Sequence, residues 1–272
     1  MIAADYNVSA TFFQQPTGTL PRREYPPRGR RGIIIWKVKV AGTMKPEEFL
    51  KRVVLFQSLG DDDRKKLAAV LKPRALKKGE ILFRKGDEGN TFYLIRTGSV
   101  RIVLPSDMGE EVSPALLSEG DFFGEMALLD GMPRSADAVA MEPSELYALN
   151  RNDFLSFLKN NEAAIQAIFS VISKRLRKTD DLLEDACFLT ISVRFARRLV
   201  DLAWQYGKTG ADASSVRIDL RLTQKDLASM VGATRESINK EMRVLREREL
   251  ITTEGHELTI INMERLKMRA RL

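Results

Sequence analysis

The stretch Gly120–Ala136, which reads GDFFGEMALLDGMPRSA, holds side chains that could bind a phosphate and a sugar together. Arg134 offers a positive charge and a fork of donors to a phosphate, and Ser135 adds a hydroxyl or amide donor. Glu125 can accept from a ribose hydroxyl, next to the backbone amides around Gly124. Because an unpaired buried arginine is costly, a bound anion is its expected partner. The structural alternative is an Arg134–Glu125 salt bridge without a ligand.

A second set of residues, near the C-terminal end, has the order of a helix-turn-helix. Thr223 can cap a first helix, with Asp226 three residues later as in a capping box. Gly232 makes the turn, and Thr234 caps a second helix. That second helix holds Ile238, Met242 and Leu245 at core spacing.

The outward positions of this second helix could contact DNA bases. Arg235 can read guanine O6 and N7, Glu236 can accept from the cytosine N4 amino group, and Lys240 can reach guanine or a phosphate. Asn239 lies on the same predicted face. The other expected DNA contacts, mainly to phosphates, are Thr223, Gln224, Lys225, Thr234 and Ser237. An ordinary solvated helix explains any one of these residues, but not the capped pattern as a whole.

The candidate phosphate-binding stretch, Gly120–Ala136, lies in a region of short predicted strands. Between Arg74 and Leu149, apolar or alternating segments are separated by glycines, which indicates a sandwich or closed roll. The predicted strands are residues 81–83, 91–96, 99–104, 115–117 and 145–149, with a short helix-like segment at 126–129. Before this region, apolar residues that include Val54 and Val70 predict short helical faces around Asp61–Asp63.

A long helix is predicted over residues 162–186, after the roll. Steps of four and three residues give a seam of coiled-coil spacing. The seam consists of Ile165, Phe169, Ile172, Leu176, Thr179, Leu183 and Ala186. Thr179 is the one polar residue of this seam. Its hydroxyl needs a hydrogen-bond partner, either from a second subunit across a dimer or from a molecule bound beside the helix. We expect the helix to pair with its own copy; an amphipathic helix packed inside its own subunit is the alternative.

Composition and charge agree with a soluble, cytoplasmic protein that faces a polyanion. The 272 residues are 44% hydrophobic and 30% charged, which suits about two domains. No apolar run approaches the ~20 residues of a membrane span, and the start does not resemble a secretory signal. Residues 188–272 hold 16 Lys and Arg against 11 Asp and Glu, whereas residues 44–187 hold 21 against 24. This asymmetry is expected when only the C-terminal part meets nucleic acid.

The single cysteine, Cys187, and the single histidine, His256, exclude several kinds of site. One chain cannot form an internal disulfide, a four-cysteine iron–sulfur cluster or a multi-histidine metal centre. Metal ligands of a roll-fold enzyme and a nucleophile–base pair are both missing, so we expect no enzymatic activity. Haem or iron–sulfur sensing is disfavoured for the same reason.

Residues 1–43 are unlike the rest of the chain, being rich in proline and arginine. They could form a disordered basic extension or an arm that adds non-specific attraction to DNA. A third interpretation, which we favour slightly, is a start-site artefact with natural translation beginning at Met44.

These motifs carry a family resemblance. Phe123–Leu129 followed by Pro133–Ala136 resembles the phosphate-binding cassette of cyclic-nucleotide-binding domains, Phe-Gly-Glu-x-Ala-Leu and then Pro-Arg-Ser/Thr/Ala-Ala. With the long helix and the helix-turn-helix in the same order, the chain resembles the bacterial catabolite-activator (cyclic AMP receptor, Crp/Fnr) family. The resemblance implies an α+β fold in three parts. They are a β-roll (jelly roll) nucleotide-binding domain at 44–160, a dimerisation helix at 161–187 and a winged helix-turn-helix domain at 188–272.

The resemblance also implies an effector, cyclic AMP. In the family, the residue equivalent to Thr179 meets the adenine amino group, and the next residue, here Asp180, reaches in from the other subunit. Asp180 departs from the expected Ser or Asn, so another nucleotide such as cyclic di-GMP, or no ligand, is the alternative. The expected nucleotide-binding residues are Gly124, Glu125, Met126, Ala127, Arg134, Ser135, Thr179 and Asp180.

The resemblance further implies that the protein is a homodimer that binds a palindromic DNA site with half-sites of TGTGA type. RNA polymerase is the expected protein partner. Lys240 stands where the best-known member has an arginine, which should weaken bidentate reading of that base. Two other classes of protein are rivals. One is a nucleotide-binding regulatory subunit that acts on another protein, and the other is a roll-fold enzyme.

Overall fold

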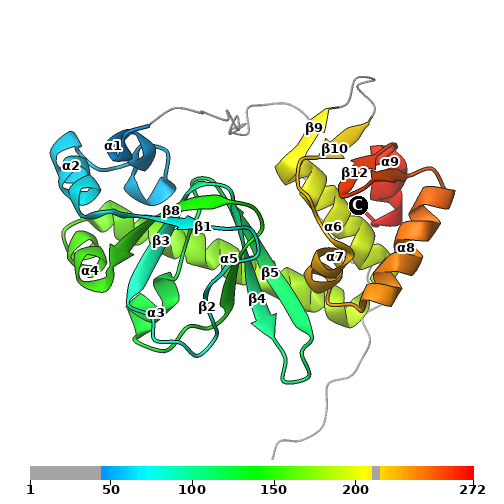
Figure 1. Cartoon of the computed structure of the whole chain (residues 1–272), viewed down its shortest axis with the longest axis horizontal. Helices are drawn as coiled ribbons and strands as arrows, with labels where there is room; N and C mark the ends of the chain where they lie inside the picture. Colours follow the sequence, from blue (N-terminus) through cyan, green and yellow to red (C-terminus); the bar gives the residue numbers. More distant parts are fainter. Residues whose placement is uncertain (1–43, 210–214) are drawn as a thin grey trace, which may run out of the picture.

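The computed structural model describes residues 44–209 and 215–272, so the predicted extension at 1–43 lies outside the described residues. A β-rich domain is followed by the long helix α5 (Glu162–Phe188) and a smaller, mainly helical C-terminal domain (Figure 1). This order confirms the α+β fold class predicted from the sequence. In the described part of the chain, no helix has the length and apolar character needed to span a membrane.

Three short helices lead into the roll, and their buried residues share one core with α4 and the start of α5. The three are α1 (Pro46–Leu50), the 3-10 helix η1 (Val54–Phe56) and α2 (Asp61–Val70), whereas α4 (Arg151–Lys159) follows the roll. Val54 and Val70 belong to the predicted apolar faces but are 56% and 38% exposed. The apolar faces are therefore narrower than the sequence pattern indicates.

The roll consists of two four-stranded antiparallel sheets. One has the order β1-β8-β3-β6 and the other β2-β7-β4-β5. The strands are β1 (Lys72–Leu76), β2 (Ile81–Phe83), β3 (Thr91–Thr97), β4 (Ser99–Pro105), β5 (Glu111–Ser118), β6 (Phe122–Phe123), β7 (Asp137–Ala140) and β8 (Ser144–Asn150). Helix α3 (Glu125–Asp130) lies between β6 and β7, so the residues of the predicted cassette sit on the connection between the two sheets.

Three of these strands, β1, β6 and β7, were not predicted from the sequence. β1 is an edge strand that contains Pro73, and four of its five residues are exposed, so it lacks the alternation that marks a strand. β6 has only two residues. β7 contains two alanines, which favour strands weakly, and it is held by pairing with β2 and β4.

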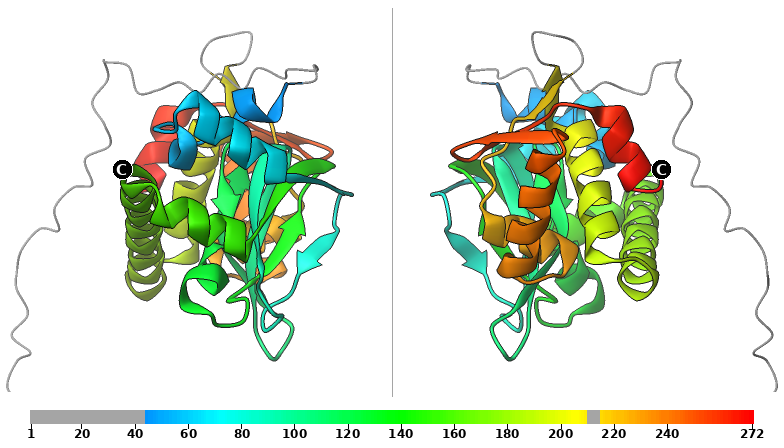
Figure 2. Two further views of the ribbon diagram at one scale, coloured as in Figure 1. Left: turned by 90° about the vertical axis from the view of Figure 1, so that its left-hand side faces the viewer. Right: turned by 90° about the vertical axis from the view of Figure 1, so that its right-hand side faces the viewer.

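Helix α5 joins the two domains, and Figure 2 shows it along one side of the molecule. The Asn161 side chain caps its first turn. Only three of its 27 residues are buried, namely Ala164, Ile168 and Asp185. Three members of the predicted seam, Phe169, Leu176 and Leu183, are 64%, 61% and 65% exposed. This exposure argues against a helix packed wholly inside its own subunit and leaves an apolar stripe for a second helix.

The C-terminal domain begins after Leu189, whose extended backbone separates α5 from α6. A four-stranded sheet of order β11-β12-β10-β9 packs beside the helices. The Gly255 turn, at φ 59°, joins β11 and β12 into the predicted hairpin wing. The elements are α6 (Ile191–Tyr206), β9 (Gly207–Thr209), β10 (Val216–Ile218), α7 (Gln224–Val231), α8 (Arg235–Glu247), β11 (Ile251–Glu254), β12 (Glu257–Ile260) and α9 (Met263–Arg269).

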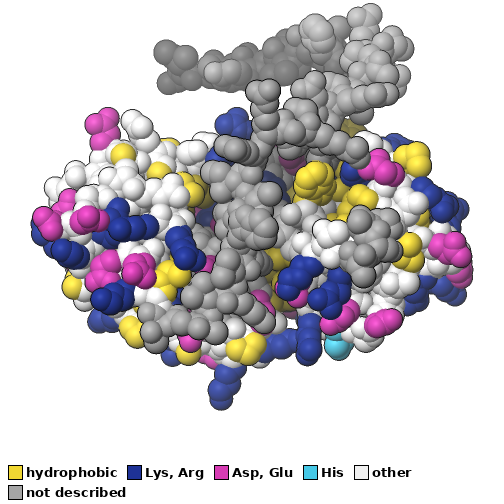
Figure 3. All heavy atoms as spheres, turned by 90° about the horizontal axis from the view of Figure 1, so that it is seen from above, with side chains coloured by type: hydrophobic (Ala, Val, Ile, Leu, Met, Phe, Trp, Pro, Cys, Tyr) yellow, Lys and Arg dark blue, Asp and Glu magenta, His cyan; other side chains and the backbone are white. Residues whose placement is uncertain are grey.

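Charged side chains of both signs are mixed over the visible surface. On the face shown in Figure 3, Lys and Arg side chains lie beside Asp and Glu side chains at both ends of the molecule. Where this face is visible, neither sign of charge marks out a DNA-binding surface by itself, so that surface has to be identified from individual residues.

Candidate functional site

A cavity of about 220 Å³ lies between the cassette and helix α5. It brings together nearly all the residues predicted to bind a nucleotide. Those lining it are Gly124, Glu125, Met126, Ala127, Arg134, Ser135 and Thr179. Asp180 is exposed on α5 and does not line this cavity of its own subunit.

Gly124 fixes the geometry at the start of α3. Its φ of 82° is in the left-handed region, which glycine adopts without strain. A Cβ atom at this position would lie 2.6 Å from Arg134 Nη1 and 3.0 Å from the carbonyl oxygen of Thr91. Glycine is therefore required twice here, by the backbone conformation and by the close approach of the arginine.

Arg134 is buried, with only 5% of its surface exposed. Its guanidinium donates to the carbonyl oxygens of Gly124 at 2.9 Å and Thr91 at 2.7 Å, and it lies 4.3 Å over the Phe83 ring. Burial lowers the pKa of Arg134 below its ordinary value. Among the described residues, its Nε atom is buried without a hydrogen-bond partner. A buried cation whose partners are neutral carbonyls and aromatic rings is suited to receive an anion.

Glu125 forms its ion pair with Arg175 of α5, not with Arg134. Its Oε1 atom lies 2.8 Å from Arg175 Nη1, and Arg175 Nη2 also donates to the carbonyl oxygen of Phe122. The predicted structural alternative, an Arg134–Glu125 salt bridge, is therefore wrong. Arg175 was not predicted as a site residue, although it precedes Thr179 by one helical turn and must share its face.

Thr179 and Ser135 line the cavity with hydroxyl groups. The Thr179 hydroxyl donates to the carbonyl oxygen of Arg175 at 3.0 Å and is exposed, so it can turn to another acceptor or donor. Ser135 Oγ lies 3.6 Å from Met126 Sδ. Lys178 also lines the cavity, and burial, followed by the charge of Arg198, lowers its pKa. Lys178 was not among the residues predicted to bind a nucleotide.

An apolar wall faces these polar groups. Strands β4 and β5 supply Ile102, Leu104, Pro114, Ala115 and Leu117 to the lining. One side of the cavity thus offers charge and hydrogen bonds, and the other offers a surface suited to a flat, poorly solvated ring. This wall could not be assigned from the sequence, because it depends on how β5 folds back over the cassette.

A larger cavity, of about 420 Å³, lies between the roll and the C-terminal domain. Its lining contains as many acidic as basic side chains, namely Glu142, Asp219 and Glu257 with Lys78, Arg217 and Arg221. Two of these already form an ion pair, because Arg217 lies 3.5 Å from Glu257. This balance of charge gives no preference for an anion, so the smaller cavity is the better candidate for a nucleotide.

The helix-turn-helix is present as α7 and α8, with the predicted caps. The Thr223 side chain accepts from the Asp226 backbone amide at 3.1 Å, and Asp226 accepts from the Thr223 amide at 2.8 Å, which completes the capping box. Gly232 ends α7 at φ 62°, and Thr234 caps α8. The predicted core positions Ile238, Met242 and Leu245 are all buried.

Most of the side chains predicted to meet DNA are exposed on these two helices and their N-caps. Arg235, Glu236 and Lys240 are exposed at the start of α8. Arg235 Nε donates to Gln224 Oε1 at 3.3 Å, which links the two helices. Thr223, Lys225 and Thr234 are exposed, and Gln224 and Ser237 are half-buried.

Asn239 differs from the other predicted contacts. It was predicted on the outward face, but it is half-buried and its Oδ1 atom is enclosed without a hydrogen-bond partner among the described residues. Asn239 directly follows the core residue Ile238, so it lies at the edge of the buried face of α8. Its contact with DNA stays a prediction.

Comparisons with known proteins identify both domains. A family model for the cyclic nucleotide-binding domain matches residues 73–161, and one for the Crp-like helix-turn-helix domain matches residues 193–269. A solved structure of the cyclic di-GMP responsive global regulator CLP from Xanthomonas campestris shares the fold, with a TM-score of 0.62 and 24% identity. It covers 71% of this chain and 94% of that one.

Two curated relatives are similar over most of their length. The CRP-like cAMP-activated global transcriptional regulator of Mycobacterium tuberculosis is 29% identical over 225 residues, covering 83% of this chain and all of the relative. The cyclic AMP receptor protein of Thermus thermophilus is 30% identical over 198 residues, covering 73% of this chain and 88% of the relative. The chain therefore belongs to the cyclic AMP receptor (Crp/Fnr) family, whose members are DNA-binding transcription regulators and not enzymes.

Proposed function

We propose that this protein is a homodimeric transcription regulator that binds cyclic AMP between the roll and the paired α5 helices. The observation that carries the proposal is Arg134, a buried guanidinium whose Nε atom has no partner among the described residues. A cyclic phosphate supplies both the charge and the acceptor atoms that this group needs.

The residues around the cavity match the parts of the nucleotide. Arg134 and Ser135, with backbone amides near Gly124, would hold the phosphate. Glu125 would accept from the ribose hydroxyl, since a carboxylate can accept about four hydrogen bonds and the bond to Arg175 uses only one of them. The apolar wall of β4 and β5 would contact the base. Thr179 and the partner subunit's Asp180 would meet the adenine amino group.

Ligand binding would be transmitted through α5. The cavity is lined both by the cassette and by Arg175, Lys178 and Thr179 of this helix, so a ligand there touches the roll and the dimer seam at once. We infer that the ligand extends or re-registers the helices between Thr179 and Leu189. The coupling free energy is then the difference in ligand affinity between the two helix arrangements.

DNA would be read by α8. Arg235 is suited to guanine O6 and N7, and Glu236 to the cytosine N4 amino group. A symmetric dimer would place the two α8 helices in successive major grooves, about 34 Å apart, on a palindrome with TGTGA-type half-sites. Thr223, Gln224, Lys225, Thr234, Ser237, Asn239 and Lys240 are the further proposed contacts. Bound at a promoter, such a dimer would have RNA polymerase as its protein partner.

An alternative proposal is that the protein binds DNA in the same way but responds to another effector. Asp180 carries a charge at the position where the family resemblance leads us to expect Ser or Asn in a protein that responds to cyclic AMP. In addition, Lys178 adds a cation to the cavity beside Arg134 and Arg175. The Xanthomonas campestris regulator with this fold is responsive to cyclic di-GMP. Cyclic di-GMP, or DNA binding without a ligand, is therefore the alternative.

Fluorescence anisotropy on a labelled duplex distinguishes cyclic AMP as the effector from the alternatives, cyclic di-GMP or no ligand. The duplex carries TGTGA and TCACA separated by about six base pairs, and cyclic AMP or cyclic di-GMP is titrated at fixed salt. We expect a large gain in DNA affinity with cyclic AMP for the wild type and none for Arg134→Ala. Arg84→Ala, which removes an exposed arginine of the same domain, is the control and should respond normally. A normal response of Arg134→Ala would refute the assignment of the cavity.

The same assay tests the reading of bases. Arg235→Ala should weaken binding by about 1 to 3 kcal/mol and relax specificity at one base pair of each half-site. Equal weakening on all sequences would show that Arg235 contacts only the DNA backbone.

A further inference from the structure

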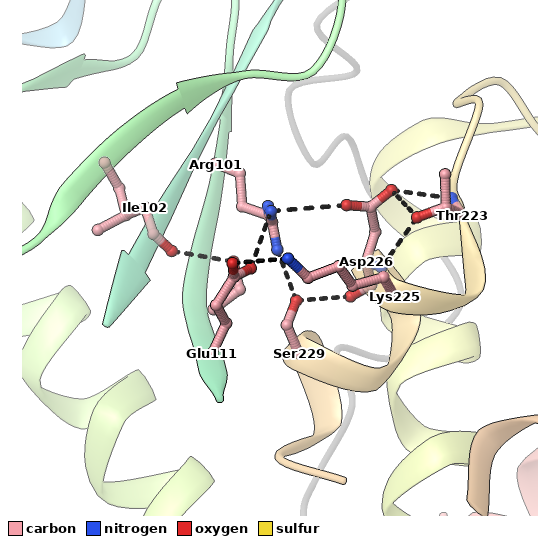
Figure 4. Close-up of polar contacts among 8 residues, drawn as sticks. Arg101, Ile102, Glu111, Thr223, Lys225, Asp226 and Ser229 are labelled. Carbon is pink, nitrogen blue, oxygen red and sulfur yellow. Dashed lines mark hydrogen bonds and ion pairs between the residues drawn. The ribbon is translucent and has the colours of Figure 1, made fainter. Parts of the chain in front are cut away.

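The β4–β5 hairpin of the roll contacts α7 of the helix-turn-helix through a chain of alternating charges (Figure 4). Arg101, on β4, donates from Nη1 to Ser229 Oγ at 2.7 Å, and its Nη2 lies 3.7 Å from Asp226. Glu111, at the start of β5, lies 2.8 Å from the Lys225 ammonium and 3.4 Å from Arg101. Two of these ion pairs therefore join the roll to α7, one between Glu111 and Lys225 and the other between Arg101 and Asp226.

The cluster is shielded at one end and open at the other. The side chains of Arg101 and Asp226 are 8% and 13% exposed, that of Glu111 is 24% exposed and that of Lys225 is 65% exposed. Burial acts to raise the pKa of Glu111, but the hydrogen bond and charge of Lys225, with the charge of Arg101, outweigh it and lower the pKa overall. Glu111 is thus a carboxylate held between two cations.

Further contacts fix the same docked position. The Arg198 guanidinium donates to the carbonyl oxygens of Ser113 and Met230, both at 3.4 Å. Leu116 of β5 and Met141 pack against the core of the C-terminal domain. Because these contacts orient the domain, the charged cluster falls at the N-terminal turn of α7.

We propose that this cluster is an electrostatic latch in which Glu111 takes the place of a DNA phosphate on Lys225. The proposal rests on the proposed DNA-binding function, for which Lys225 is a phosphate contact. A phosphate that approaches the Lys225 ammonium meets the Glu111 carboxylate, 2.8 Å from that ammonium and of the same sign as the phosphate. DNA must therefore displace Glu111, and the latch lowers DNA affinity while the domains stay docked.

The latch can open without unfolding α7. The capping bonds between Thr223 and Asp226, and the bond from Ser229 Oγ to the carbonyl oxygen of Asp226, each join residues three positions apart in α7 and its N-cap, so none of them involves the roll. Release removes only the bonds to the roll, while Arg101 keeps Glu111 beside it on the hairpin. The open end at Lys225 is exposed to solvent and so is screened by salt.

The decisive variant is Glu111→Gln, and the hairpin offers a matched control. Glu110 is the preceding residue, exposed and without a side-chain ion pair in the described part of the chain, so Glu110→Gln removes the same charge without touching the latch. In the absence of nucleotide and at low salt, we expect Glu111→Gln to bind the TGTGA duplex about 3- to 10-fold more tightly than the wild type. Glu110→Gln should gain less than about twofold.

Hydrogen exchange gives a readout that needs no DNA. Peptides covering α7 and β5 should exchange faster in Glu111→Gln, and in the second variant Arg101→Met, than in Glu110→Gln. Equal DNA affinities of Glu111→Gln and Glu110→Gln would overturn the latch, as would unchanged exchange in α7. Weaker DNA binding by Glu111→Gln would show that the docked arrangement is the DNA-binding one, which also overturns it. If the wild type with nucleotide binds no DNA at all, the proposed function itself fails.

Discussion

The guanidinium of Arg175 lies 2.8 Å from the carboxylate of Glu125, so helix α5 is tied to the cassette inside a single protomer. The pair spans fifty positions of sequence and joins the proposed sugar-binding group to the dimer helix. A ligand that accepts or donates at Glu125 therefore acts on a residue already bonded to α5. This relationship gives the site a direct mechanical connection to the helix that carries the seam.

Breaking this pair should destabilise the roll. Arg175→Met leaves the buried Glu125 carboxylate without its cation, and we expect a loss of about 2 to 3 kcal/mol in the free energy of unfolding. The loss is below that of a fully buried pair because the Arg175 side chain is 31% exposed. Urea unfolding measures it, with the exposed Arg177→Met as control, expected within about 0.5 kcal/mol of the wild type. Glu125→Gln combined with Arg175→Met should cost less than the sum of the single changes.

A methyl group at position 124 should disable the cassette by two separable effects. Gly124→Ala forces a left-handed backbone on alanine and places a Cβ atom 2.6 Å from Arg134 Nη1. Gly120 has a similar φ of 86° but open space around it, so Gly120→Ala isolates the backbone cost of about 1 to 2 kcal/mol. We expect Gly124→Ala to cost more in urea unfolding and to lose cyclic AMP binding in calorimetry. Equal stability losses and intact nucleotide binding in both variants would contradict the clash with Arg134.

The apolar stripe on α5 should decide the oligomeric state. Leu176 is 61% exposed in the single chain, and its burial against a second copy would be lost in Leu176→Glu. We expect this variant to sediment as a monomer in analytical ultracentrifugation at concentrations where the wild type is a dimer. Ser173→Glu adds the same charge to an exposed, non-seam position of α5 and should stay dimeric. Dissociation of both variants would point to charge repulsion and not to the seam.

The buried hydroxyl of Tyr206 should make stability depend on alkaline pH. It donates to the carbonyl oxygen of Leu116 at 3.3 Å, and burial raises the pKa of Tyr206 from 10.0 to about 12. A group whose pKa is raised in the folded state stabilises the protein fully below its unfolded pKa, and this contribution is lost as the pH rises through the folded pKa. Between pH 10 and 12, the wild type should therefore lose stability more steeply than Tyr206→Phe. Urea unfolding at several pH values tests this, and parallel curves would contradict it.

The sequence predicted the local elements that carry strong periodic or capping signals. The seam of α5, the Thr223 and Thr234 caps and the core triad of Ile238, Met242 and Leu245 depend on residues a few positions apart. Such short-range relations fix a helix and its buried face wherever it later packs. The cassette was predictable for a similar reason, since its turn, helix start and arginine lie within one short stretch.

Tertiary structure alone decided which groups meet across long distances. The edge strand β1 and the alanine-containing β7 have weak intrinsic preferences and are held only by pairing with strands far away in sequence. Arg175 reaches Glu125, and Arg101 and Glu111 reach Asp226 and Lys225, because the packing of the roll, α5 and α7 brings them together. Charge is visible in a sequence, but an ion pair depends on distances of a few ångströms that only the packed chain sets.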